Sequence, residues 1–422
     1  MNREEKNRRI SESKAKTKER RKDRVCLTYE IKVVTSKLSR AQKDDVNQVY
    51  REAKWVRNAA VCDFKSAVRD PKSVKVKVGE DFEERKLEIL GSGIKQEIYD
   101  KVKSEIKGLS TKKKKGEKVG ALKPKSYCNT IYLKQYGNTY SIDFEHNRIK
   151  VQNIKKPFYV RGLKQIPKDA EITCAKLTRK ASGLYFYITV YVDKKEVRTT
   201  GEKVGIDFGI EHNMTLSNGQ TFDVCVPESK AVKLASKRLN KAWVHNGRKT
   251  SNRQRKLRAK LNKAYEKNTN RRLDIGKKVV HELLTSYDFI AVQNEMIHNW
   301  QAGLFGKQVQ YSAMGFIIAE LKKSSKTHIV ERSFPSTQIC PVCGRMTKHP
   351  LDKRDYDCLY CGYHHDSRDE KSATSILDEA LRQVSLEQGA QSLVEAETAT
   401  SISHESKSTR KSSFKKREAQ VL

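Results

Sequence analysis

The chain has 422 residues, and its 87 Lys and Arg against 51 Asp and Glu give a formal net charge of +36. The charged opening and the lack of any apolar run near the roughly 20 residues that span a bilayer predict a soluble protein without a secretory signal. So large a positive charge favours a polyanionic partner, although basic membrane-surface and ribosomal proteins share this property.

The first hundred residues contain charged and amphipathic segments in turn. Residues 1–24 form a charged, apolar-poor arm that we expect to be disordered without a partner. The stretch 25–34 is rich in β-branched residues and typical of a strand. Residues 39–68 have apolar residues at helical spacing, with Ser39 as a suitable N-cap. Further helix is predicted between residues 82 and 108.

The pattern changes from about residue 125. Short Tyr-, Ile- and Val-rich runs separated by turn residues continue to about residue 195 and predict an all-β module of the barrel type. Residues 229–285 are helical in pattern and very basic. They suit a solvated helical face or a helical pair that follows phosphates, and we favour the second because Lys or Arg occurs on nearly every turn. The apolar-poor segment after residue 378 predicts disorder.

Four of the nine cysteines form two CxxC pairs, Cys340/Cys343 and Cys358/Cys361, separated by fourteen residues. Tetrahedral Zn²⁺ binds four thiolates, and two CxxC turns supply them in pairs. The alternative is four unligated thiols. A site with four protein ligands has no open position, so we predict a structural zinc site. The other five cysteines are expected to be reduced core residues.

Three separate segments each end in a carboxylate. Asp207 ends the apolar run KVGID, Glu295 follows the run FIAVQN, and Asp366, Asp369 and Glu370 lie at a predicted helix start. A carboxylate beside a buried strand is costly unless it is paired or binds a cation. Strand-end aspartates also cap turns, Asp366 is a possible N-cap, and Glu370 a first-turn residue that favours the helix dipole. If the segments converge, they can hold two Mg²⁺ ions that promote phosphodiester cleavage.

At these residues the sequence resembles a known family. The order Asp207, Glu295 and Asp369, with the four cysteines between the second and third, is similar to the split RuvC nuclease of TnpB proteins and of miniature type V CRISPR effectors of the V-F type. The resemblance includes NRRLDIGKKVVHEL, FPSTQICPVCG and LYFYITVYV, and extends over residues 120–378. The Ser-, Glu- and Lys-rich tail also resembles that of transposon-borne TnpB proteins.

The resemblance implies an RNA-guided DNA endonuclease with Asp207, Glu295 and Asp369 as Mg²⁺ ligands and catalytic residues, and with Cys340, Cys343, Cys358 and Cys361 on structural Zn²⁺. It implies a guide RNA and a target DNA as partners, a monomer or a homodimer on the guide RNA, and a bacterial cytoplasmic protein that joins the nucleoid when DNA-bound. Guide–target pairing would read the sequence, and the protein a short duplex motif beside the target.

The fold class implied is α/β multidomain: an RNase H-like (RuvC) nuclease domain with an inserted zinc-binding module, preceded by a β-barrel wedge domain with a helical recognition insertion. The expected domains are a basic disordered arm (1–24), the first wedge strand or strands (25–38), a helical recognition lobe (39–124), the wedge β-barrel (125–200), the RuvC-like nuclease with its first two motifs and basic helices (201–335), a zinc-binding target-nucleic-acid module (336–363), the third RuvC motif (364–378) and a disordered tail (379–422).

The sequence departs from the family at two positions. Where the family has an asparagine two residues after the third aspartate, and another four residues later, this chain has Lys371 and Ser375. A lysine there can weaken metal binding or face substrate phosphate. The alternatives to an active nuclease are therefore an RNA-guided DNA-binding regulator without cleavage, and a zinc- and nucleic-acid-binding protein without a guide.

Overall fold

The computed structural model describes residues 2–79, 81–194, 199–245, 250–350 and 353–387. The chain divides into two compact units, residues 1–196 and 197–422. Among the described residues, no helix is both long and apolar enough to cross a membrane.

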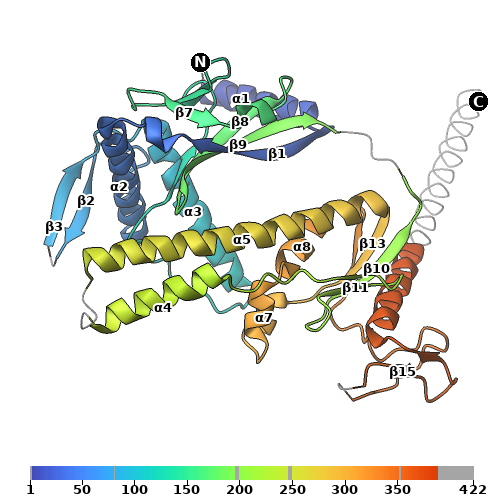
Figure 1. Ribbon diagram of the computed structural model, residues 1–422. Helices are drawn as coiled ribbons and strands as arrows, with labels where there is room; N and C mark the ends of the chain where they lie inside the picture. Colours follow the sequence, from blue (N-terminus) through green and yellow to red (C-terminus); the bar gives the residue numbers. More distant parts are fainter. Residues whose placement is uncertain (1, 80, 195–198, 246–249, 351–352, 388–422) are drawn as a thin grey trace, which may run out of the picture. The chain divides into compact units, whose positions relative to one another are not determined.

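The first unit contains an antiparallel sheet of seven strands in the order β4-β8-β9-β1-β7-β6-β5 (Figure 1). Strand β1, far from the others in sequence, lies at the centre, where it pairs with β7 and β9. The predicted strands are therefore confirmed as one sheet with β4 and β5 at its edges, and closure into a barrel stays a prediction. The strands are β1 (Arg24–Val33), β4 (Thr130–Leu133), β5 (Tyr140–Asp143), β6 (Arg148–Val151), β7 (Phe158–Arg161), β8 (Glu171–Lys180) and β9 (Gly183–Asp193).

The insertion between β1 and β4 contains two helices and a hairpin, α2 (Arg40–Cys62), β2 (Ser73–Val78), β3 (Asp81–Lys86) and α3 (Ser92–Lys114). Helix α2 begins where the sequence predicts: the Ser39 hydroxyl accepts from the Gln42 backbone N–H, and the Gln42 side chain accepts from the Ser39 N–H. The prediction of helix between residues 82 and 108 is wrong for its first residues, because residues 81–86 form strand β3, which pairs with β2.

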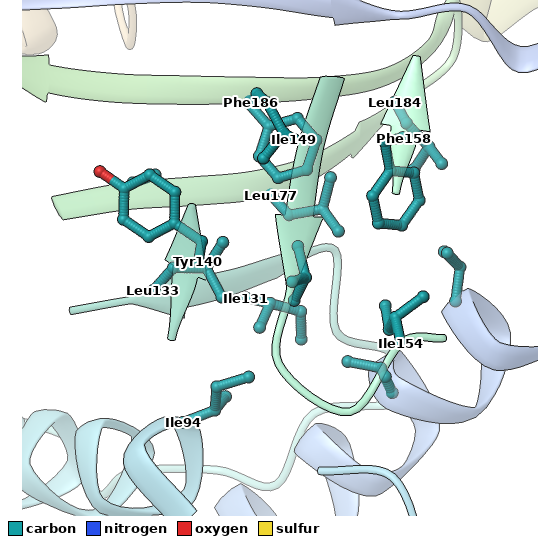
Figure 2. Close-up of a cluster of buried hydrophobic side chains, with 14 of the residues drawn as sticks. Ile94, Ile131, Leu133, Tyr140, Ile149, Ile154, Phe158, Leu177, Leu184 and Phe186 are labelled. Carbon is teal, nitrogen blue, oxygen red and sulfur yellow. The ribbon is translucent and has the colours of Figure 1, made fainter. Parts of the chain in front are cut away.

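Buried side chains from the sheet and from the insertion form one core (Figure 2). Phe158 on β7 and Phe186 on β9 pack edge to face, with ring centroids 5.6 Å apart. Ile94 from α3 belongs to the same cluster. The inserted helices are therefore held against the sheet by apolar contacts, at roughly 1.5–3 kcal/mol per fully buried side chain.

A buried carboxylate fixes the connection between the hairpin and α3. Glu52 on α2 has no exposed surface, and it accepts hydrogen bonds from the backbone N–H groups of Glu88 (3.0 Å), Ile89 (3.2 Å) and Leu90 (2.8 Å). These bonds repay the cost of burying the charge. The residue therefore closes the loop that precedes α3.

Residues 1–24 differ from the predicted disordered arm, because α1 (Arg3–Arg20) is a helix. Opposite charges one turn apart stabilise it, as in the pair Arg9–Glu5 at 3.0 Å. The end of the helix is bound to the sheet through Glu171 on β8, which pairs with Arg20 at 2.7 Å and Arg21 at 2.6 Å. Ion pairs thus stabilise this helix, although its low apolar content predicted disorder.

The second unit contains a mixed sheet in the order β12-β11-β10-β13-β14. Strands β10, β13 and β14 are parallel neighbours, and β11 and β12 continue antiparallel from β10. The strands are β10 (Lys203–Asp207), β11 (Met214–Leu216), β12 (Thr221–Phe222), β13 (Phe289–Gln293) and β14 (Thr327–Val330).

Helices cover both faces of this sheet. Val204, Ile206, Ile290 and Val292 face a core with α5 (Asn252–Ser286) and α8 (Met314–Leu321). Side chains alternate along strands, and Ala291 faces the other way, toward a helix that the structure describes over residues 368–387. The short helices α6 (Ile297–Trp300) and α7 (Gly306–Tyr311) follow β13.

The helix predicted within residues 229–285 is confirmed over α4 (Lys230–His245) and α5, which lie side by side (Figure 1). The predicted disordered tail begins too early, because residues 379–387 belong to helix 368–387, where Ala380 packs against the sheet. The rest of that tail, residues 388–422, lies outside the described residues.

Candidate functional site

The first two predicted carboxylates lie at one edge of the second unit's sheet. Asp207 is the last residue of β10, and Glu295 comes two residues after β13. These two strands are parallel neighbours, so their carboxyl ends meet at the same edge, where ligand sites of parallel sheets commonly lie. Asp369 enters from helix 368–387, in its first turn. The fold therefore brings all three segments to one end of the sheet.

Electrostatics indicate that the three carboxylates are coupled. Burial and, after it, the negative charges of Asp369 and Glu295 together raise the pKa of Asp207 to about 7. Burial also raises the pKa of Glu295, against the opposing effect of the Arg332 and Lys322 charges. Two neighbouring acids with raised pKa values are a common sign of a functional site, and together with Asp369 they suit a cation.

The three carboxylates do not form a cage for a single ion. Among the described residues, two groups have ligand atoms that all lie within 4.8 Å of one another: the four cysteines of the CxxC pairs, and Asp355, Asp357 and His364. Asp207, Glu295 and Asp369 are more widely spread than that.

A glycine lets the third carboxylate approach the first. Gly205 lies on β10, two residues before Asp207, and a Cβ atom there would overlap the carbonyl oxygen of Ala373 and lie 3.0 Å from the Leu377 Cβ. Helix 368–387 therefore packs directly on the β10 backbone. A side chain at this position would push the helix, and Asp369 with it, away from the strand.

We expect Gly205→Ala to lower the melting temperature of the protein and to reduce by about 100-fold the DNA cleavage that the sequence resemblance implies, since a misplacement of about 1 Å near reacting groups has effects of that size. The strain should cost about 1–3 kcal/mol. Thermal melts and cleavage rates measure the two effects. Gly108→Ala on α3, where an added Cβ meets nothing within 4 Å, is the control. Unchanged cleavage in the Gly205 variant would contradict the close packing.

The four predicted cysteines converge. The Sγ atoms of Cys340 and Cys361 are 3.6 Å apart, as are those of Cys343 and Cys358. Tetrahedral zinc with Zn–S bonds of about 2.3 Å separates its sulfurs by about 3.8 Å, so the spacing fits. Gly344 and Gly362 after each pair have φ of 68° and 73°, which glycine adopts at little cost.

The acidic residues around the cysteines have other partners. Asp357 accepts from His364 at 2.6 Å and also pairs with Lys353, which lies 3.5 Å from Asp355. These contacts lower the pKa of Asp357 to about 2, mainly through Lys353. The group is therefore an ion-paired surface cluster around the two-stranded element β15 (Tyr356–Asp357) and β16 (His364–His365).

The candidate acids at the start of helix 368–387, Asp366, Asp369 and Glu370, have different surroundings. Asp366 is exposed and lies 3.0 Å from His364 Nε2, so it is neither the helix cap nor part of the carboxylate group. The Ser367 hydroxyl accepts from the Glu370 N–H at 3.2 Å and caps the helix instead. Ser372, fully buried in the next turn, contacts Asp207 and partly offsets the rise in its pKa.

Lys371 has a role that neither sequence interpretation foresaw. It has no exposed surface, so it cannot reach substrate phosphate. Its Nζ donates to the carbonyl oxygens of Ser336 (2.9 Å) and Ile339 (2.7 Å) and lies 3.9 Å from the centroid of the Tyr356 ring. The ammonium is thus bound under the cysteine module, although burial lowers its pKa to about 8.

Sequence reasoning missed Gln293, Ser336 and Ser372. All three are buried polar residues that lie next to predicted site residues in the chain or in the fold. The one signal in the sequence was Gln293, a polar residue at the end of an apolar strand, but the sequence does not show which groups it binds.

Two family models match the chain in order. The family OrfB_IS605, described as "Probable transposase", matches residues 187–299, and "Cas12f1-like, TNB domain" matches residues 316–376. A Streptomyces pristinaespiralis protein named "Putative RNA-guided DNA endonuclease" is 26% identical over 248 residues, which is 56% of this chain and 60% of that protein. The match thus covers less than two thirds of this relative. These similarities confirm the resemblance to TnpB proteins and miniature type V effectors.

Proposed function

Because the chain is similar to TnpB proteins and miniature type V effectors, we propose that it is an RNA-guided DNA endonuclease. One observation carries this proposal. The two matched segments contain the three coupled carboxylates and the four clustered cysteines, in the order that this class of nuclease requires.

The nuclease domain is a RuvC-like fold in this proposal. Its support is the mixed five-stranded sheet, with the first two carboxylates at the carboxyl ends of adjacent parallel strands and the third on the helix that packs on β10. The domain boundaries predicted from the sequence belong to the same proposal.

Asp207, Glu295 and Asp369 would hold two Mg²⁺ ions. Carboxylate oxygens are the ligands that Mg²⁺ prefers, and three acids that do not all lie within 4.8 Å of one another are compatible with more than one ion. When bound, such a pair activates a water and stabilises the leaving oxygen of a phosphodiester. The protein supplies the spacing, and the half-buried position of Asp207 and Glu295 limits access of water.

Cys340, Cys343, Cys358 and Cys361 would hold a structural Zn²⁺. The 3.6 Å sulfur spacing and the closed set of four thiols support this assignment. Burial raises the pKa of Cys358, but hydrogen bonds from the backbone N–H groups of Tyr360 and Cys361 and from the Cys361 and Cys343 thiols together lower it to about 6. Despite a backbone hydrogen bond that lowers it, the pKa of Cys361 is raised instead, by burial and by the side chains of Cys358, Cys340 and Cys343, so within this group Cys358 is the thiol that most readily becomes the thiolate that binds zinc.

A guide RNA and a target DNA would be the partners. The charge of +36 suits two polyanions. The Lys and Arg side chains of α4 and α5 are nearly all exposed and available to phosphates. The number of chains on one guide, and the place of the protein in a bacterial cytoplasm, remain predictions.

The test is purification of the protein with its co-purifying RNA, sequencing of that RNA, and incubation with matched DNA and Mg²⁺. We expect one defined RNA and cleavage of matched DNA only. Bound but uncut DNA would indicate the regulator, and absence of a defined RNA a protein without a guide. The contacts of Lys371 remove the reason for the regulator, since its ammonium is occupied by carbonyl oxygens.

The raised pKa of Asp207 predicts pH-dependent Mg²⁺ binding. Protons compete with Mg²⁺ for a carboxylate of pKa about 7, so the apparent affinity should fall about tenfold from about pH 8 to about pH 6. Without Mg²⁺, this group's folded pKa lies above its unfolded value, so its contribution to stability falls as the pH rises from about 4 to 7.

Thermal melts with and without Mg²⁺ at about pH 6 and about pH 8 measure this effect. The Mg²⁺-induced rise in Tm should be larger at the higher pH. In Asp207→Asn the rise should be small and independent of pH. An equal rise at both pH values in the unmodified protein would refute the assignment.

A further inference from the structure

The segment between β14 and the first cysteine is bound from two sides. Residues 331–339 join Val330, the end of β14, to Cys340. On one side, the Gln293 Nε2 donates to the carbonyl oxygens of Glu331 (3.3 Å), Arg332 (3.2 Å) and Phe334 (2.7 Å). The segment therefore has buried hydrogen bonds to the end of β13, two residues before Glu295.

On the other side, the segment is bound by helix 368–387. The Lys371 ammonium donates to the carbonyl oxygens of Ser336 and Ile339 at 2.9 and 2.7 Å. Ser336 connects the two sides, because its hydroxyl donates to the Gln293 Oε1 at 3.1 Å. One buried network thus joins the strand before Glu295, the entry to the cysteine module and the helix that carries Asp369.

The buried polar groups of this network have few other hydrogen-bond partners to turn to. Lys371, Gln293 and Ser336 are all buried, and a buried donor that loses its acceptor costs about 1–3 kcal/mol, more for a charge. The Tyr356 ring beneath the ammonium is itself fully buried, and its hydroxyl donates to the Gln338 carbonyl oxygen at 3.0 Å. The position of helix 368–387 is therefore tied to the position of the cysteine module.

We propose that Lys371 is a positioning residue for DNA cleavage. It holds the helix of Asp369 against the segment that enters the cysteine module, and Gln293 holds the strand before Glu295 against the same segment. The proposal rests on the nuclease function proposed above. Lys371 does not contact substrate, since it has no exposed surface; it acts through the placement of Asp369, only two residues away.

The test variant is Lys371→Met, which keeps an unbranched side chain one heavy atom shorter and removes the ammonium. We expect a smaller Mg²⁺-induced rise in Tm, faster amide exchange in residues 331–339 and in the first turns of helix 368–387, and cleavage reduced about 100-fold. Zinc content and guided DNA binding should stay as in the unmodified protein. Combined with Gln293→Leu, the substitution should add little to the defect of either alone, because both act on one network.

Ser375→Ala is the matched control. Ser375 is buried in the same helix, but the hydrogen bond that its hydroxyl donates among the described residues stays within that helix, to the Lys371 carbonyl oxygen at 3.0 Å. This variant should keep the Mg²⁺ response, the exchange pattern and cleavage.

Two results overturn the proposal: a Lys371→Met protein with unchanged Mg²⁺ response and exchange, or one in which zinc, DNA binding and overall stability fall together with cleavage. If the unmodified protein fails to cut matched DNA while Lys371→Met still weakens the Mg²⁺ response and loosens residues 331–339, the nuclease function fails and the positioning role stands.

Discussion

Asp207→Ala should abolish DNA cleavage, with a loss of about 10²–10⁴-fold or more, and leave guided DNA binding intact. Asp207 lies at the centre of the carboxylate group, since the charges of both Asp369 and Glu295 act on it. Its removal takes away one of the three proposed Mg²⁺ ligands, and loss of a catalytic group has effects of this size. Guide–target pairing and the basic helices do not depend on this carboxylate, so binding should persist.

Cleavage of labelled matched DNA and a gel-shift titration with the same DNA measure the two activities. The control is Asp274→Ala on α5, which removes an exposed carboxylate paired with Lys278 in the same unit. Without Mg²⁺ at about pH 8, the Asp207 variant should also melt at a higher temperature than the unmodified protein, because a buried charge repelled by two others is gone. Equal cleavage by variant and unmodified protein would exclude Asp207 from the site.

Cys340→Ser should remove the zinc and sharply reduce cleavage while most guide binding and the overall fold survive. A structural zinc site contributes its binding free energy to folding, about 10–16 kcal/mol in small zinc peptides, so the loss of one thiolate should unfold the module locally. The cores of the two units are built from other residues. The defect should reach the nuclease site because Ile339, next to Cys340, is an acceptor for Lys371.

Metal analysis should find about one zinc per chain in the unmodified protein and much less in the variant. The control is Cys62→Ser, which alters an exposed cysteine at the end of α2 and should keep both zinc and cleavage. A Cys340→Ser protein that cuts normally, or an unmodified protein without zinc, would refute the role of the module.

Local features were readable from the sequence because their physical cause lies within a few residues. The N-cap at Ser39 needs a small polar side chain just before an amphipathic run, and each pair of zinc ligands needs a CxxC turn. Asp207 and Glu295 were found in the same way, as carboxylates at the ends of apolar strands. The order of these motifs along the chain was enough to indicate the family.

Partners that depend on distant segments were decided by the tertiary structure alone. Strand β1 takes the centre of its sheet because β7 and β9, which come much later in the chain, pair with its two edges. Glu52 has the pattern of a surface helix residue, but the fold buries it against three backbone N–H groups. Helix α1 is ordered by charge pairs with Glu171, which no local pattern reveals.

Lys371 shows this division most clearly. By sequence it is a cation two residues from the proposed metal ligand Asp369, and its position alone favoured interference with metal binding or contact with phosphate. In the fold its ammonium binds two carbonyl oxygens of a segment more than thirty residues earlier in the chain. The sequence by itself determined which residues are the candidates for metal binding, because each type of ligand has a local signature. The tertiary structure decided which of them are buried together, because the partner of a buried polar group depends on how segments distant in sequence pack.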